Sequence, residues 1–184
     1  MTGRVGGGDA ERRVGQGQGA GRWVLLSYRL PREPSTPRIG VWRKLERLGV
    51  ARLGDGLVAL PADARTREQL DWLAEEIGEA GGTATVWLAT PGSAAQERAI
   101  AQAMQDARAT EYQAVVVQAR SAAGGAVAER ARAARRLRGE LRRIARRDFF
   151  PPPERDTAQA AVQALTADPT GTDRAAAEAL EERR

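Results

Sequence analysis

The sequence contains neither cysteine nor histidine. Without cysteine, the chain can form no disulfide, bind no metal through thiolates and use no thiol as a nucleophile. Without histidine, it can build no serine hydrolase triad, and it lacks the usual ligands of a zinc site. Only carboxylates are left for catalysis. We predict a protein that is not an enzyme and that has neither a cofactor nor a metal site.

Long apolar runs are also missing. A helix that spans a bilayer needs about 20 consecutive apolar residues, and no stretch of this chain comes near that length. The N-terminus lacks the apolar stretch of a secretory signal peptide. We therefore expect a cytoplasmic protein with no membrane partner.

Lysine is almost absent, because Lys44 is the only lysine among 29 basic residues. The arginines are concentrated in one segment. Ten of them lie between residues 120 and 147, where only two glutamates oppose them, so that this segment has a net charge of +8 in a chain of +5. On a helix, guanidinium groups at this density match phosphate oxygens and release counterions when a nucleic acid binds. The predicted nucleic-acid-binding residues are Arg130, Arg132, Arg135, Arg136, Arg138, Arg142, Arg143, Arg146 and Arg147.

A second interpretation of these arginines stays open. They could form the solvated face of a helical hairpin, paired in part with the glutamate-rich helix expected over residues 64–80 or with Glu178, Glu181 and Glu182. Surface ion pairs of this kind are common and weak. Phosphate contacts would in any case position the protein without reading a base sequence, and the chain shows no helix-turn-helix signature.

Residues 1–21 are rich in glycine and poor in apolar side chains, so they cannot bury enough surface to offset the entropy lost on ordering. We predict a disordered arm. The glycines between Gly15 and Gly21 resemble a phosphate-binding loop, but such a loop follows a strand and opens a helix, whereas these residues precede the first expected strand.

Residues 22–91 have the pattern of a ferredoxin-like domain. Trp23–Leu30 indicates a buried central strand stopped by Pro31, and Asp55-Gly56 indicates the turn of a hairpin. Helices are expected over residues 36–49 and 64–80, and a last strand over residues 83–89. This order predicts an α+β fold, in which a split βαββαβ antiparallel sheet carries both helices on one face.

The two helices of this domain give more specific predictions. Thr36 should cap the first helix, and Pro37 should take its first position. Its buried face is predicted to consist of Ile39, Trp42, Leu45 and Leu48. Trp72 falls off the apolar stripe of the second helix and is predicted to belong to an interface. Because ferredoxin-like sheets frequently pair, we expect a homodimer.

Residues 92–150 are predicted to form a helical hairpin. Ser93 and Gln96 make a capping box that opens a helix ending near residue 121. Val115-Val116-Val117 are poor helix formers, so helix and strand both stay open over residues 112–119. The arginine-rich helix follows over residues 126–147, with Val127, Ala131, Ala134, Leu137, Leu141 and Ile144 as its apolar seam.

The C-terminal part gives fewer predictions. Phe149 and Phe150 precede three prolines and are predicted to dock the hairpin on the core. Residues 151–184 should form short helices and be partly disordered.

Several landmarks occur in an order that resembles the N-terminal domain of the chromate resistance protein ChrB. They include Trp23-Val24-Leu25-Leu26, Leu30-Pro31, Leu60-Pro61, Arg67-Glu68-Gln69-Leu70-Asp71-Trp72-Leu73, Glu111-Tyr112 and Arg147-Asp148-Phe149-Phe150. The resemblance covers roughly residues 22–165. It implies a DNA-binding transcriptional regulator of a chromate-efflux operon, with chromate or a related oxyanion as its effector. Longer family members carry a further C-terminal domain.

The same domain is similar to the ferredoxin-like module of PaaX-type repressors and of small CRISPR-associated metal-dependent nucleases. Those nucleases place an aspartate at the end of the first strand to hold a divalent cation. Here the corresponding residues are Leu26-Ser27-Tyr28-Arg29, which include no carboxylate. The sequence therefore argues against nuclease activity.

Four other arginines define a weaker candidate oxyanion site. Arg29, Arg32, Arg38 and Arg43 lie near the end of the first expected strand and the start of the first helix, where backbone amides also favour anions. Scattered surface arginines are the alternative. For the whole protein, the alternative to a DNA-binding regulator is a non-catalytic interaction or dimerisation module that pairs its hairpin with an acidic partner.

Overall fold

The structure is a computed structural model that describes residues 21–167. Most of the predicted N-terminal arm and the acidic residues Glu178, Glu181 and Glu182 lie outside this range. The elements are β1 (Trp23–Arg29), α1 (Ser35–Leu48), β2 (Ala51–Gly54), β3 (Leu57–Pro61), α2 (Ala64–Glu79), β4 (Thr83–Ala89), α3 (Ala94–Ala122), α4 (Val127–Ala145) and α5 (Glu154–Ala164). Among these helices, none is long and apolar enough to cross a membrane.

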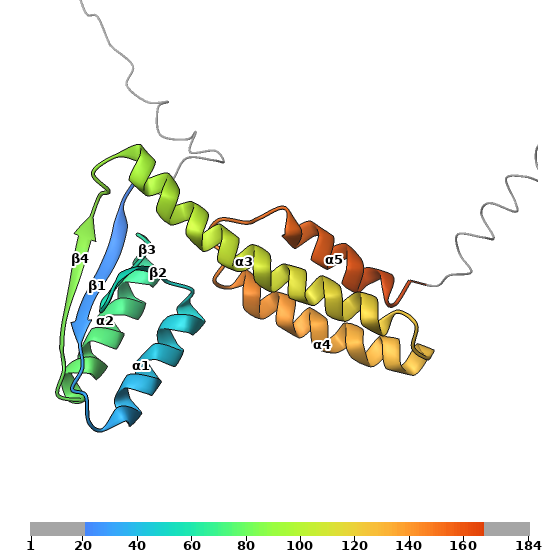
Figure 1. Ribbon diagram of the computed structural model, residues 1–184, viewed down its shortest axis with the longest axis horizontal. Coiled ribbons are helices and arrows are strands. Elements are labelled where there is room, and N and C mark those ends of the chain that lie inside the picture. The colour runs from blue at the N-terminus through green and yellow to red at the C-terminus, as the bar shows by residue number, and fades with distance from the viewer. Residues whose placement is uncertain (1–20, 168–184) are drawn as a thin grey trace, which may run out of the picture.

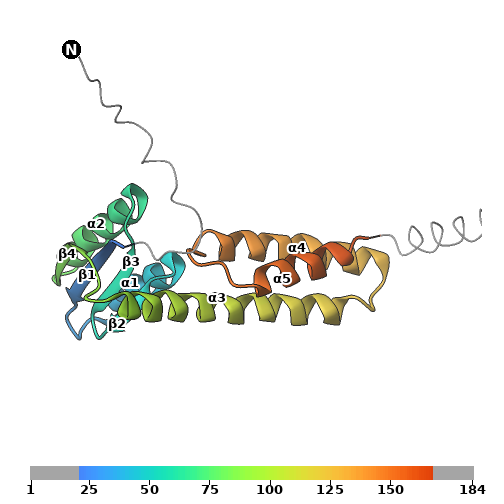
Figure 2. The same ribbon diagram turned by 90° about the horizontal axis from the view of Figure 1, so that it is seen from above.

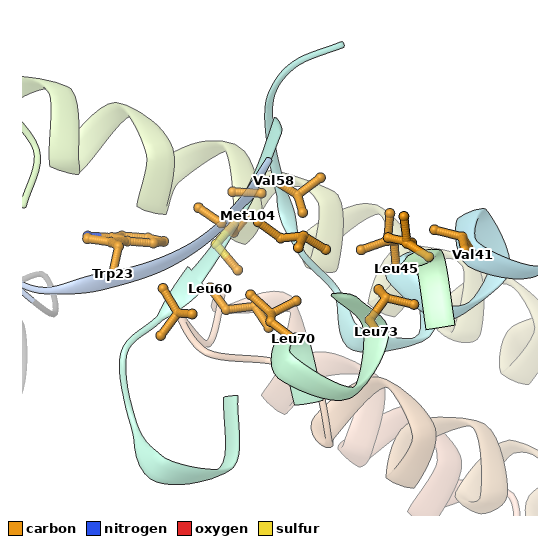
Figure 3. Packing of buried hydrophobic residues seen from close by; sticks show 13 residues of the cluster. Trp23, Val41, Leu45, Val58, Leu60, Leu70, Leu73 and Met104 are labelled. Atoms are coloured by element: carbon orange, nitrogen blue, oxygen red, sulfur yellow. The ribbon is translucent and has the colours of Figure 1, made fainter. Parts of the chain in front are cut away.

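The four strands form one antiparallel sheet in the order β2-β3-β1-β4. Helices α1 and α2 lie together on one face of it (Figures 1 and 2). This is the arrangement expected from the order of the elements, and it confirms the predicted α+β, ferredoxin-like fold. The first core contains Val58 and Leu60 of the sheet together with Leu45, Leu70 and Leu73 of the two helices (Figure 3).

Helix α2 begins and ends as predicted. The Asp63 side chain accepts from the Thr66 amide at 2.6 Å, and the Thr66 hydroxyl accepts from the Asp63 amide at 3.0 Å, which makes a capping box. At the other end the Gly82 amide donates to the Ile77 carbonyl at 2.9 Å. The apolar stripe of α2 expected from the sequence consists of Leu70, Leu73, Ala74 and Ile77; the three large residues are buried and Ala74 is half-buried.

Two predictions for α1 are wrong. The helix begins at Ser35 after an extended Pro34, with no side-chain cap, so that Pro37 lies inside the first turn instead of opening it. This turn tolerates proline because its amides have no partner within the helix. The buried face is also shifted: Leu45 is buried as predicted, but Val41 is buried in place of Ile39 and Trp42, which are 47% and 50% exposed.

Helix α3 runs without interruption for 29 residues, about 44 Å at the rise of an α-helix. It contacts the sheet near its start and packs against α4 and α5 farther on (Figure 2). Residues 112–119 are therefore helical. Val115 and Val116 are buried in a second core with Leu137, Ile144 and Val162, and this burial outweighs their low helix propensity.

The second core has three helices, because α5 completes the hairpin of α3 and α4. Val127, assigned by sequence to the seam of α4, is instead 73% exposed at the first position of that helix. The two phenylalanines dock as predicted: both pack against the first core, and the rings of Phe150 and Trp23 stack with centroids 6.0 Å apart.

Candidate nucleic-acid interface

Helix α4 presents a broad arginine face. It buries Ala134, Leu137 and Ile144 against α3 and α5. The opposite face carries seven exposed arginines at spacings of three and four residues, which place them on the same side of the helix. These residues are Arg132, Arg135, Arg136, Arg138, Arg142, Arg143 and Arg146. We call them the α4 arginine face. From Arg132 to Arg146 it extends about 21 Å along the helix axis.

The α4 arginine face makes no ion pair with any residue in the range 21–167. The five ion pairs found there join other residues, and none links α4 to the glutamate-rich α2. Two members bind neutral groups: Arg136 donates to the Gln118 amide oxygen at 2.7 Å, and Arg138 donates to the Thr166 hydroxyl at 2.8 Å. Their full positive charge therefore faces solvent.

Two arginines of the predicted set are placed differently. Arg130 is half-buried and donates to the Gly125 carbonyl at 3.4 Å. Arg147 lies beyond the end of α4, where it pairs with Glu111 of α3 and donates to the Glu46 carbonyl at 3.1 Å. Arg147 therefore joins the ferredoxin-like part to the helical bundle and does not belong to the exposed face.

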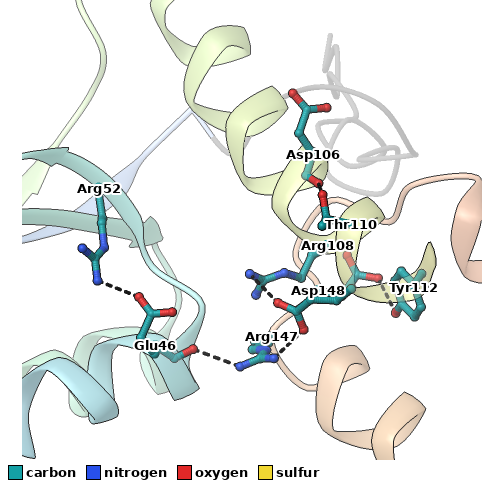
Figure 4. A network of polar contacts seen from close by, with 9 residues as sticks. Glu46, Arg52, Asp106, Arg108, Thr110, Tyr112, Arg147 and Asp148 are labelled. Atoms are coloured by element: carbon teal, nitrogen blue, oxygen red, sulfur yellow. Dashed lines mark hydrogen bonds and ion pairs between the residues drawn. The ribbon is translucent and has the colours of Figure 1, made fainter. Parts of the chain in front are cut away.

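This joint is a polar network in which Arg108 and Arg147 meet the Glu111 carboxylate, and Arg147 reaches Glu46 at the end of α1; Figure 4 shows both arginines and Glu46. Arg108 donates to Glu111 at 2.9 Å, so that one carboxylate accepts from two guanidinium groups. Gly49, which follows α1, has a φ of +71°, and a Cβ there would lie 2.8 Å from both the Arg108 Nη1 and the Arg147 Cβ. Glycine is therefore required where α1 meets the joint.

Beside this network, the Tyr112 hydroxyl donates to the Asp148 carboxylate at 2.9 Å. Burial raises the pKa of the Asp148 carboxyl, and the hydrogen bond from Tyr112 lowers it by less. Burial also raises the pKa of Tyr112, and the adjacent carboxylate adds to this increase. At neutral pH the tyrosine is a hydrogen-bond donor that fixes the start of the Phe149-Phe150 segment against α3.

The weaker candidate oxyanion site consists of exposed side chains. Arg29, Arg32, Arg38 and Arg43 are all exposed around the connection from β1 to α1, and Arg38 donates to the Pro31 carbonyl at 2.8 Å. An anion held there would be bound at the surface. Within residues 21–167, no three acidic side chains gather as a metal site would require.

Comparison with known proteins places the chain in a family. The family model described as "Protein ChrB, N-terminal" matches residues 38–180. The chain therefore belongs to the ChrB N-terminal family. It is 35% identical over 134 residues to Protein ChrB of Cupriavidus metallidurans, and the aligned part is 70% of this chain but 40% of that relative. The resemblance predicted from the sequence landmarks is confirmed.

The part of the chain matched by the ChrB N-terminal model includes α4 and the whole joint. The local sequence predicts α4 but gives no role to Arg108 or Glu111. Their spacing of three residues on one helix is a recognisable signal for an ion pair. Their connection to Arg147 has no local signal, because the partners lie 36 residues apart in the sequence.

Proposed function

We propose that this chain is a DNA-binding transcriptional regulator of the chromate-resistance type, and that the α4 arginine face contacts DNA phosphates. The observation that carries the proposal is this face itself: seven exposed arginines over about 21 Å, without an ion pair in the described part of the chain. Membership of the ChrB N-terminal family supports the regulatory part of the proposal.

The chemistry of guanidinium favours phosphate as the ligand. Each arginine offers a planar fork of donors that matches two phosphate oxygens, and its charge is retained at every physiological pH. Along B-DNA, 21 Å corresponds to about six base pairs. A rigid helix with arginines on one face can therefore follow one stretch of backbone without rearrangement, and binding is driven by release of counterions.

Chromate or a related oxyanion is the proposed effector. The support is family membership together with the four exposed arginines near the start of α1. Chromate and sulfate share their charge and shape, so calorimetric titration with both anions is the informative comparison. Heat from chromate alone supports an effector role, and equal heat from both anions indicates non-selective surface binding.

The alternative is an interaction module that pairs its hairpin with an acidic partner helix. A partner that packs along the apolar seam of α4 would need that seam to be free. Ala134, Leu137 and Ile144 are instead covered by α3 and α5. On α4, only the arginine face is left for a partner. This favours a polyanion that binds through its charges over a helix that packs through apolar side chains.

A gel-shift series in increasing salt tests the proposal. The upstream region of the protein's own gene and an unrelated duplex serve as probes. For about seven phosphate contacts, log K should fall with log salt with a slope near −6, so that affinity drops by more than a thousandfold between 50 and 200 mM salt.

The decisive variant replaces Arg135, Arg136, Arg142 and Arg143 by alanine and should lose most of the shift. The matched control replaces Arg22, Arg47 and Arg65 of the ferredoxin-like domain and Arg98 of the first turns of α3, four exposed arginines away from α4, and changes the net charge by the same amount. An equal loss of DNA binding in both variants would show that binding depends on net charge alone and not on the α4 arginine face. Retained binding by the α4 variant would refute the proposal.

A further inference from the structure

The face of the sheet opposite α1 and α2 is partly uncovered. The strand register places Leu25 beside Trp87 and Ser27 beside Thr85, and alternation puts all four side chains on this face. Ser27, Thr85 and Trp87 belong to the half formed by β1 and β4. We call this half the open sheet face. Helix α3 covers the other half, where it crosses β2.

The open sheet face is nearly free of charge in a chain with 29% charged residues. Only Arg29 and Arg52 are charged among the strand residues. Arg52 pairs with Val58, which points to the face covered by α1 and α2. Arg29, at the last position of β1, lies on the open sheet face by the same alternation as Leu25 and Ser27, at the end away from Trp87. The surface between Leu25 and Thr85 is neutral, and Arg29 marks its edge.

An ordered tryptophan projects from this neutral surface. Trp87 is 54% exposed, although exposing an aromatic ring of this size to water is unfavourable. Its indole N–H donates to the Ser27 hydroxyl at 3.1 Å. The hydrogen bond fixes the orientation of the ring on the sheet, so little side-chain entropy is left to lose when a partner covers it.

A groove lies beside the tryptophan on the same face. It has a volume of about 400 Å³ and runs between the sheet and the first turns of α3. Its lining includes Leu25, Leu53, Ala59, Pro91 and Ile100. Because Leu25 is also the cross-strand neighbour of Trp87, the projecting ring and the groove form one continuous apolar surface.

We propose that a second copy of this chain packs on the open sheet face, with Trp87 of each copy seated in the groove of the other. In a two-fold dimer the same surface meets itself, so any charge on it would be opposed by an equal charge. A neutral surface avoids this repulsion in a basic protein. A two-fold interface also requires that a projection and its complementary hollow occur on the same surface, as they do here.

The groove is large enough for an indole, since cavities of this size hold whole small molecules. Because Trp87 is 54% exposed before association, each tryptophan would add about half of the 150–250 Å² that a fully buried aromatic side chain covers. Tryptophans are frequent anchors of stable interfaces. This interface would account for the homodimer that the sequence predicts. It does not depend on the proposed function, because self-association is measured without DNA.

Sedimentation velocity over a series of protein concentrations up to about 100 µM tests the interface. The wild-type chain should form a dimer, and Trp87→Arg should weaken self-association by at least tenfold. The matched control is Trp72→Arg, because Trp72 is 64% exposed on α2, on the other side of the sheet. The same variant tests the alternative that Trp72, which the sequence assigns to an interface, holds the dimer. This control should sediment as the wild type does. Leu53→Arg places the charge in the groove and should also give a monomer.

The absence of cysteine from the chain allows an independent test. Thr85→Cys puts one thiol on the open sheet face, where a bulky maleimide label should block self-association, whereas the same label on Thr110→Cys, at an exposed threonine of α3, should not. A wild-type monomer at every concentration would overturn the proposal. So would self-association that persists in both Trp87→Arg and Leu53→Arg, or that is lost equally in Trp72→Arg.

Discussion

The joint between the two cores should depend on a single carboxylate. Glu111 accepts from both Arg108 and Arg147, whose side chains are 13% and 23% exposed. Replacing Glu111 by alanine leaves two guanidinium groups close together, with little access to water and without an ion-pair partner, although Asp148 remains as a negative charge near Arg108. Breaking a buried pair costs about 3–5 kcal/mol. Because these side chains retain some contact with water, we expect a loss of about 3 kcal/mol in the free energy of unfolding.

A matched control is available at the other edge of the joint. The Glu46 side chain pairs only with the exposed Arg52, while its backbone carbonyl holds Arg147. Glu46→Ala therefore keeps the contact with Arg147 and should cost less than about 1 kcal/mol. Urea denaturation of the wild type and both variants gives the comparison, and the melting temperature of Glu111→Ala should fall by about 6–12 °C. Equal, small losses in the two variants would refute the importance of the network.

Three further predictions concern the joint and the helix α1 that ends at it. Burial raises the pKa of Asp148 above its ordinary value of 3.8. Between pH 3.8 and the raised pKa, Asp148 is therefore protonated more often in the folded protein than in the unfolded chain. The free energy of unfolding should therefore fall as the pH rises through this range. In urea denaturation at several pH values, Asp148→Asn should show a smaller dependence of this free energy on pH. An unchanged dependence would contradict the raised pKa of Asp148. Gly49→Ala should destabilise the protein by more than about 1 kcal/mol. The backbone at Gly49 has a positive φ, and the added Cβ would collide with the Arg147 side chain. Gly40→Ala, inside α1 with open space around it, should stabilise by about 0.5–1 kcal/mol, and thermal melts of both variants give the signs.

The order of the elements could be predicted because local signals mark where they stop. Pro31 ends the first strand, Asp55-Gly56 turns the hairpin, and Gly81 and Gly82 end α2. The prediction for the buried face of α1 is wrong because this short helix has two apolar stripes that both include Leu45, one through Val41 and one through Trp42. Trp42 strengthens the wrong stripe, yet the sheet is covered by Val41.

The candidate interface was predicted in part for similar reasons. Charge density and spacing along α4 are properties of the local sequence, so its arginine face could be recognised. Arg147 looks like a continuation of that face. Its role depends on Glu111 and on the Glu46 carbonyl, which is 101 residues away in the sequence, and only the folded chain brings these groups together.

The unbroken course of α3 has a mechanical consequence. The helix contains neither glycine nor proline over its 29 residues, and it belongs to both cores. It therefore acts as a stiff lever. A tilt of about 5° at the sheet would displace the far end, about 44 Å away, by about 4 Å. In the proposed complex with DNA, that displacement is close to the spacing of neighbouring base pairs, so a small motion at the sheet would shift the charged face by about one step along the duplex.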